Sequence, residues 1–213
     1  MIFSAAYWSD IRVCLFLSAL LTTTSLAAPG YTQSLIIPDN TLAEDEQSVI
    51  LPGNDSIPVE LILNGAQRGQ NLFHSFEEFN VDEGRAAYFV IDNNNIQNIF
   101  SRVTGNQPSN ILGVLGTRRF GEGNVLQTNA NLYFINPNGI LFGPNPSLDL
   151  GGSFFATTSD AVQFGAQGSF SATNPAAPSE LLTINPSAFL FGASPGTITN
   201  QSFARSSTAS SFT

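Results

Sequence analysis

The segment Asn129–Thr158 constrains the fold of this chain more than any other. It contains three short, mostly apolar runs: Leu132–Ile135, Ile140–Phe142 and Leu148–Leu150. Between them lie Asn136-Pro-Asn-Gly139 and Gly143–Ser147, rich in the proline, glycine and asparagine that turns require. Runs this short exclude helices and predict strands that change direction every few residues. The Asn-Gly pair also permits a hairpin, in which the flanking runs would pair directly.

The same pattern recurs further along the chain. Leu181–Gly192 aligns without a gap on Leu132–Gly143, with seven of twelve residues identical and an offset of 49 residues. A recurrence at that period indicates a solenoid or a propeller blade. One circuit of a parallel β-helix takes about 20–25 residues, so the offset predicts two circuits. A propeller or a lectin-like sandwich is the alternative architecture.

Strand alternation within this segment predicts which side chains face a core. The side chains expected inside are Leu132, Phe134, Phe142, Leu148 and Leu150, with Asp149 turned outward. Stacked coils would also place equivalent asparagines in register, where their amides can bond along a ladder. Asparagine-rich connections such as Asp92–Asn95 then need no ligand to explain them.

Composition and charge exclude several classes of function. Only 11% of residues are charged, lysine is absent, and seven arginines face sixteen acids for a net charge of −9. This balance argues against binding nucleic acid or an anionic membrane. The acidic run Glu44–Glu46 is expected in a solvated loop, because adjacent carboxylates on an extended chain point to opposite faces and no calcium-type loop follows.

The single histidine, His74, has no catalytic or metal-binding partners in the sequence. The chain offers no second histidine, no nucleophile motif and, outside its first segment, no cysteine. We therefore expect His74 to be packed beside Ser75 in a tight turn, and we expect no metal and no cofactor.

Residues 1–27 are expected to form a signal peptide. An apolar run, Val13–Leu21, precedes Ser25 and Ala27, which occupy the −3 and −1 positions of a cleavage site after Ala27. The run is too short to span a membrane, so we do not expect an integral membrane protein. Cys14 lies within this segment, so a mature chain would contain no disulfide.

Three motifs, in order along the chain, carry a family resemblance. They are Gly69–Val81, Ile96–Gly105, and Asn131–Gly143 followed by Gly151–Ala156. Together they resemble the haemagglutination-activity, or two-partner secretion (TPS), domain of filamentous haemagglutinin-like exoproteins, from about Ile36 to Gly192. The resemblance implies a right-handed parallel β-helix, a single-stranded solenoid with N-terminal capping strands. We expect residues 28–192 to form this domain and residues 193–213 to be a low-complexity tail or the truncated start of a passenger.

The resemblance also implies a function. It describes an exoprotein that crosses the periplasm of a Gram-negative-type bacterium and is recognised by an outer-membrane β-barrel transporter with POTRA domains. Outside the cell, the domain would template β-helix folding and serve adhesion to a carbohydrate or protein of a host or neighbouring cell. The positions that match the family's secretion motifs are Asn136, Pro137, Asn138 and Gly139, together with Asn71, Leu72, Phe73, His74, Ser75 and Phe76.

A β-helix carbohydrate-active enzyme, or a lectin-like carbohydrate-binding domain, is the alternative function. Polysaccharide cleavage usually requires a basic residue beside clustered acids. This chain has no lysine, and its arginines are scattered except for Arg118-Arg119. The sequence therefore favours a non-enzymatic role.

Overall fold

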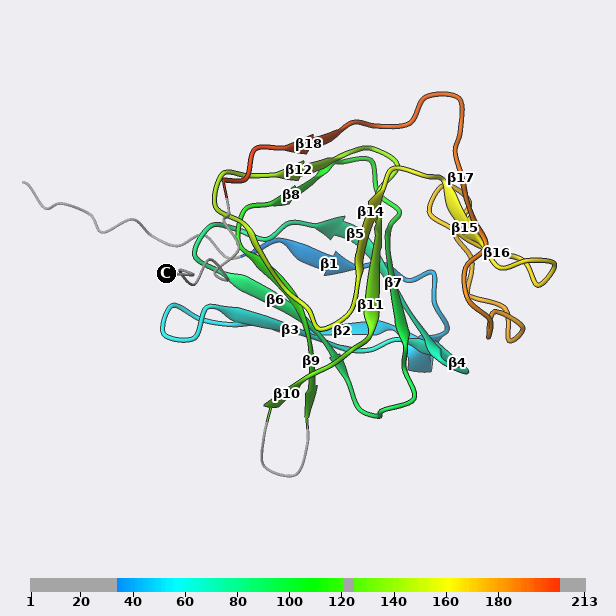
Figure 1. Ribbon diagram of the computed structural model, residues 1–213, viewed down its shortest axis with the longest axis horizontal. Coiled ribbons are helices and arrows are strands. Elements are labelled where there is room, and N and C mark those ends of the chain that lie inside the picture. The colour runs from blue at the N-terminus through cyan, green and yellow to red at the C-terminus, as the bar shows by residue number, and fades with distance from the viewer. Residues whose placement is uncertain (1–33, 121–124, 204–213) are drawn as a thin grey trace, which may run out of the picture. The chain divides into compact units, whose positions relative to one another are not determined.

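The computed structural model describes residues 34–120 and 125–203. Within these ranges the chain is all-β, and its one helical segment is the 3₁₀ helix η1 (Glu44–Glu46) (Figure 1). The predicted all-β class is therefore confirmed. The predicted signal peptide, residues 1–27, lies outside the described residues, as do residues 204–213 of the predicted tail.

Sheet I contains six strands, of which four run parallel. These four, in spatial order, are β5 (Asn71–Phe79), β7 (Asn98–Val103), β11 (Asn131–Ile135) and β14 (Phe154–Thr157). β1 (Ile36–Pro38) and β4 (Ala66–Arg68) pair antiparallel with β5. Asn71 lies beside Asn98, and Asn98 beside Asn131, so equivalent positions recur after 27 and 33 residues.

Sheet II has the same organisation. Its parallel series is β3 (Val59–Asn64), β6 (Ala86–Ile91), β9 (Val114–Phe120) and β13 (Ser147–Asp149). β2 (Ser48–Leu51) pairs antiparallel with β3, and β10 (Val125–Gln127) pairs antiparallel with β9. β1 and β2 lie in the N-terminal part of the chain, where capping strands were expected, and each borders the first strand of a parallel series.

Sheet III is short and parallel, with β12 (Ile140–Phe142) between β8 (Ser109–Ile111) and β18 (Ile198–Asn200). From β6 to β14 the chain visits the sheets in the order II, I, III, II, I, III, II, I. The three sheets surround a common interior (Figure 1). Each circuit adds one strand to each sheet, and for this reason neighbouring strands run parallel.

Aromatic and aliphatic side chains from all three sheets fill this interior. Its most buried rings are Phe76, Phe79, Phe89 and Phe134. Phe79 and Phe134 meet edge to face, with centroids 4.9 Å apart. Leu132 and Phe134 are fully buried, so their predicted inward orientation is confirmed.

Sheet I is also buried on its outer face. Phe73, Phe100 and Tyr133 point outward in a stack with centroid separations of 5.1 and 4.6 Å. Antiparallel sheet IV covers them, with strands β15 (Ala161–Gln163), β16 (Ser169–Ser171) and β17 (Ala188–Leu190). Because both faces of β5 are covered, its first six residues are buried without a polar alternation.

The sequence repeat is not a structural repeat, and the prediction of two circuits per 49 residues is wrong. Leu132–Gly143 contributes β11 and β12 to parallel sheets I and III, whereas Leu181–Gly192 contributes only β17, which is antiparallel in sheet IV. The second copy follows the β15–β16 hairpin, whose turn holds Gly165 and Gly168 at positive φ. The chain has left the stacked circuits by this point.

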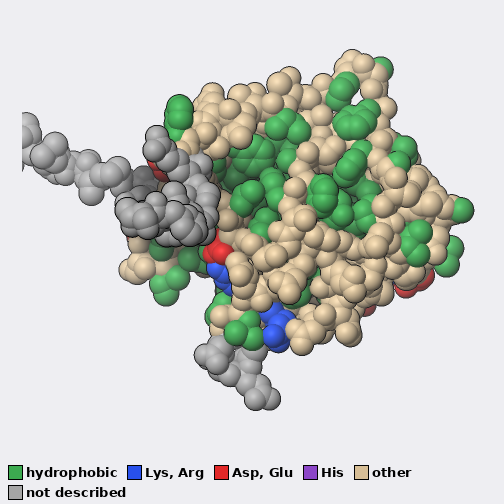
Figure 2. All heavy atoms as spheres, viewed as in Figure 1, with side chains coloured by type: hydrophobic (Ala, Val, Ile, Leu, Met, Phe, Trp, Pro, Cys, Tyr) green, Lys and Arg blue, Asp and Glu red, His purple; other side chains and the backbone are tan. Residues whose placement is uncertain are grey.

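Leu148 also departs from its predicted position inside the core. It is 50% exposed, although Leu115, its neighbour in register, is fully buried. β13 is the last described strand of the parallel series in sheet II, so no further strand covers Leu148. Figure 2 shows apolar side chains gathered near β12 and β14 on the face turned to the viewer.

Strand pairing continues beyond residue 192, where we expected a patternless tail to begin. Ile198–Asn200 forms β18 and pairs with β12. None of the helical structure in residues 34–120 and 125–203 has the length and apolar character needed to cross a membrane.

Candidate functional site

The segment Asn136–Gly139 forms a turn between sheets I and III. The Gly139 amide donates to the Asn136 carbonyl at 3.1 Å, and the Asn138 amide donates to Asn136 Oδ1 at 2.9 Å. Gly139 has φ of +124°, a conformation that glycine adopts without strain. β11 and β12, on either side of the turn, lie in different sheets, so the hairpin alternative is wrong.

The Asn136 side chain is fully buried and ties this turn to the preceding circuit. Its Nδ2 donates to the Gln107 carbonyl at 3.0 Å and to Ser109 Oγ at 2.9 Å. Both Oδ1 and Nδ2 of Asn136 are thus hydrogen-bonded within the folded domain. The folded domain therefore does not present the Asn136 amide to a partner.

Asn138 is the exposed side chain of the turn. Its Nδ2 donates to the Gly105 carbonyl at 2.7 Å, and Pro137 beside it is partly exposed. One circuit earlier, the Thr104 amide donates to the Phe76 carbonyl at 2.8 Å. The end of the Asn71–Phe76 motif and the Asn136–Gly139 turn therefore lie along one corner of the fold, separated by residues 104–109.

Asn71 lies at the opposite end of its motif and begins an asparagine ladder. Asn131 donates to Asn98 Oδ1 at 3.0 Å, and Asn98 donates to Asn71 Oδ1 at 2.9 Å. Asn71 Nδ2 in turn donates to the carbonyls of Leu182 and Ile184 at 2.8 and 2.7 Å. A ladder of stacked asparagines was predicted for the connections between strands, whereas the structure forms one at the first residues of β5, β7 and β11. The protein's own groups supply its hydrogen-bond partners.

The apolar members of the motif belong to the two cores. Leu72 and Phe76 face the interior between sheets I, II and III, and Phe73 faces sheet IV. None of the three side chains is more than 6% exposed. The folded domain leaves none of them available as a contact surface.

His74 lies in strand β5, where we expected a tight turn. Its Nδ1 is 3.0 Å from Ser48 Oγ, and its ring packs on Phe76 and Phe89. Burial lowers the pKa of His74 to about 3, so the ring is neutral at pH 7. Nε2 is buried without a hydrogen-bond partner among the described residues. His74 is thus a core side chain.

Ser75 belongs to a buried polar network that sequence reasoning missed. Arg102 is fully buried; its Nε donates to Ser75 Oγ at 2.8 Å and its guanidinium lies 4.0 Å from the centroid of Phe170. The Ser75 hydroxyl donates to Asp39 Oδ2 at 2.6 Å. Arg102 also donates to Thr41 Oγ1 and to the carbonyl oxygens of Ser171 and Ala176. The network joins the segment after β1, sheet I and sheet IV.

Burial and hydrogen bonding set the charges in this network. Burial alone would raise the pKa of Asp39, but hydrogen bonds from Ser75, Thr104 and Thr41 outweigh it and hold the pKa below its usual value. Burial lowers the pKa of Arg102 to about 10, against the effect of Asp39. Both groups are therefore charged at pH 7. An arginine inside the apolar strand Asn98–Val103 was the one sequence feature that could have indicated the network.

Two further arginines are used in ion pairs that fix the fold. Arg68 contacts both carboxylate oxygens of Glu46 at 2.6 and 2.9 Å, so the acidic run expected in a solvated loop contributes a structural contact. Arg85 pairs with Glu60 in the interior, where both side chains are nearly inaccessible. In residues 34–120 and 125–203, no three histidine, cysteine or acidic side chains come together as a metal site.

Comparison with known families gives one match. The model of the family described as the TPS secretion domain matches residues 34–210. No curated protein and no solved structure matches the chain. The matched range includes every strand of sheets I to IV.

Proposed function

Because the chain belongs to the family of TPS secretion domains and is thus a domain of a secreted exoprotein, we propose that a cognate outer-membrane transporter with POTRA domains recognises it in the periplasm of a Gram-negative bacterium. The family is one of secretion domains, and we propose a binding role without catalysis. Residues 1–27 would direct the chain into the periplasm and be removed after Ala27.

We propose further that the stacked circuits form a right-handed parallel β-helix capped by β1 and β2. The regular visiting order of sheets I, II and III supports this proposal. β13 and β14 leave their outer edges unpaired among the described residues, and each strand carries an exposed apolar side chain, Leu148 in β13 and Phe155 in β14. Such edges accept further strands, so the domain would template the folding of a following passenger in an adhesin.

The observation that carries the recognition proposal is the contrast between Asn136 and Asn138. Both belong to the secretion motif expected from the family resemblance, yet one side chain is enclosed by four hydrogen bonds and the other is exposed at a corner. In the folded domain the motif can meet the transporter only through Asn138 and Pro137. We propose that Asn136, Gly139 and the Asn71–Phe76 strand act by shaping this corner.

Co-expression with the transporter tests this proposal. Asn138→Ala removes hydrogen bonds made at the surface, so it should melt close to wild type and still reduce the amount of secreted protein. Asn136→Ala leaves Ser109 and the Gln107 carbonyl without a partner and should lower both stability and secretion, by about 1–3 kcal/mol for stability.

The matched control is Asn94→Ala, an exposed asparagine at a different corner whose side chain makes no described hydrogen bond. Asn94→Ala should change neither the melting temperature nor the amount of secreted protein. Normal secretion of Asn138→Ala would mean that the motif is structural only. Equal loss with Asn94→Ala would mean that recognition is not localised at the Asn138 corner.

A further inference from the structure

A groove runs along the corner where sheet II strands end and sheet I strands begin. Two cavities of about 370 and 380 Å³ adjoin there, and Ile91 and Ile96 line both. β3, β6 and β9 end at this corner, so the groove crosses three neighbouring strands, or about 10 Å. It lies away from the Asn136–Gly139 turn, which joins sheets I and III.

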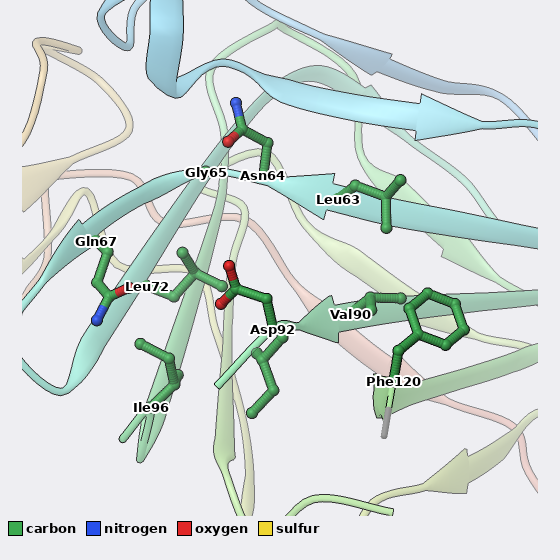
Figure 3. A pocket seen from close by; sticks show the side chains of 10 residues that line it. Leu63, Asn64, Gly65, Gln67, Leu72, Val90, Asp92, Ile96 and Phe120 are labelled. Atoms are coloured by element: carbon green, nitrogen blue, oxygen red, sulfur yellow. The ribbon is translucent and has the colours of Figure 1, made fainter. Parts of the chain in front are cut away.

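The floor and one wall of the groove are apolar. Leu72, Ile91 and Ile96 are buried beneath it, and Phe120 is 48% exposed at its side. Figure 3 shows the Phe120 ring beside Val90 and the Asp92 carboxylate projecting toward the space bounded by Asn64, Gln67 and Leu72. An apolar floor with a few convergent polar groups is the usual form of a binding site for small molecules.

The rim carries side chains with free hydrogen-bonding capacity. Asn94, Gln97 and Asn129 are exposed around the second cavity, and their amides have no described partner. Amides donate and accept hydrogen bonds, as the hydroxyl groups of sugars do. The Asp92 carboxylate adds an acceptor, since Asn93 donates to its Oδ1 and no described residue donates to its Oδ2.

Arg119 brings a positive charge to the second cavity. Among the five arginines in the described part of the chain, four are held by ion pairs or by side-chain hydrogen bonds. The Arg119 guanidinium has no such partner among residues 34–120 and 125–203, and it lines the second cavity. A guanidinium recognises a carboxylate through directed, charge-assisted hydrogen bonds.

We propose that this groove binds a short saccharide that bears an isolated carboxylate on an otherwise neutral framework. Phe120 and the aliphatic floor would pack against the C–H face of a sugar, the amides would bond its hydroxyls, and Arg119 would hold the carboxylate. The net charge of −9 disfavours a densely charged polyanion. A peptide could not add as a strand to β6 or β7, because both are already paired on both sides.

This inference rests on the adhesive role proposed above and names the class of ligand that the domain would bind. Binding of a saccharide by the purified chain can be measured without the transporter. Failure here therefore leaves the secretion proposal intact. The experiment is calorimetric titration of the purified chain with 3′-sialyllactose, lactose, a heparin tetrasaccharide and a polar hexapeptide. We expect 3′-sialyllactose to bind most tightly and lactose about tenfold more weakly, the effect of one charge-assisted contact.

Arg119→Gln should weaken the binding of 3′-sialyllactose about tenfold and leave lactose unchanged. The matched control is Arg118→Gln, which removes the same charge from the adjacent residue, whose guanidinium instead contacts Asp149 and the Tyr88 ring. Phe120→Ala should weaken the binding of both 3′-sialyllactose and lactose. Circular dichroism confirms folding of each variant.

Equal affinity for lactose and 3′-sialyllactose would overturn the proposal, as would equal losses in the two arginine variants. Preference for heparin would indicate a polyanion site, and preference for the hexapeptide a protein ligand. The absence of saturable binding to any probe would also reject the groove as a saccharide site.

Discussion

At the scale of single residues, the asparagine ladder makes a sharp prediction about stability. Asn98→Ala removes the middle rung, so Asn71 Oδ1 loses its donor and Asn131 Nδ2 its acceptor. Buried polar groups left without partners should cost about 2–4 kcal/mol in total. Urea unfolding of Asn98→Ala and of the exposed control Asn129→Ala will measure this. Similar stability of the two variants would show that the ladder contributes little.

His74 predicts how stability depends on pH. Its pKa is about 3 in the folded state and about 6.5 when unfolded, so below pH 6.5 only the unfolded chain takes up the proton. Stability should therefore fall as the pH falls, by about 2 kcal/mol between pH 7 and pH 5. The window extends from about pH 6.5 down to about pH 3.

The pH prediction has an internal control, because the chain contains a single histidine. Urea unfolding at pH 7, 6 and 5 should show the decline in wild type and a nearly flat profile in His74→Gln. A decline that persists in the variant would have to arise from carboxylates, and the buried neutral state assigned to His74 would be wrong.

The sequence could predict contacts between equivalent positions of successive circuits, but it could not predict contacts between unrelated positions. The asparagine ladder was predictable, since equivalent positions in stacked circuits bring like side chains together. The network around Arg102 was not, because its partners lie at Asp39, Thr41, Ser75, Ser171 and Ala176. Only the tertiary arrangement brings these positions together.

At the scale of elements, substitutions in β11 and β13 compare the stability contributed by a buried side chain with that of a half-exposed one. Phe134→Ala in β11 should cost about 3–5 kcal/mol, because its ring is fully buried against Phe79. Leu148→Ala in β13 should cost less than about 1 kcal/mol, because half of the side chain is exposed. Thermal and urea melts compare the two. Equal costs would mean that β13 is covered in solution.

The strands themselves were largely predictable, and their assignment to sheets was only partly so. Short apolar runs separated by turn residues indicated β11, β12 and β13 correctly. The Ile-Asn-Pro sequence occurs in both copies of the repeat, yet Asn136 binds the Gln107 carbonyl whereas Asn185 accepts hydrogen bonds from Asn98 and Gln70. Local similarity therefore determined neither the hydrogen-bond partners of the asparagine nor the sheet that the chain joins, and the second copy follows the β15–β16 hairpin into sheet IV.

At the scale of the whole molecule, Arg102 should hold three parts of the fold together. Arg102→Met keeps the volume of the side chain but removes the donor to the hydroxyl groups of Ser75 and Thr41 and to two carbonyl groups, and it removes the positive charge near Asp39. Unfolding should therefore become easier by about 3–5 kcal/mol. Arg119→Met, a loss of the same charge at the surface, should stay within about 0.5 kcal/mol of wild type. Urea unfolding measures both free energies.

Limited proteolysis distinguishes a local from a global role for Arg102. If the network joins the segment after β1 to sheet IV, Arg102→Met should expose cleavage sites in both, and Arg119→Met in neither. Cleavage confined to sheet IV would show that the segment after β1 is held by other contacts, such as the Arg68–Glu46 pair.

The acceptors that complete the early circuits come from late in the chain, and this has a consequence for timing. Asn71 donates to the carbonyls of Leu182 and Ile184. Arg68 donates to the carbonyl of Pro178, and Arg102 donates to that of Ala176. Donor and acceptor are 74 to 113 residues apart in the sequence. A chain that is released N-terminus first therefore cannot form these hydrogen bonds until residues 176–184 are also available. Earlier circuits would be reversible assemblies, and commitment to the final structure would be delayed until nearly the whole domain is available.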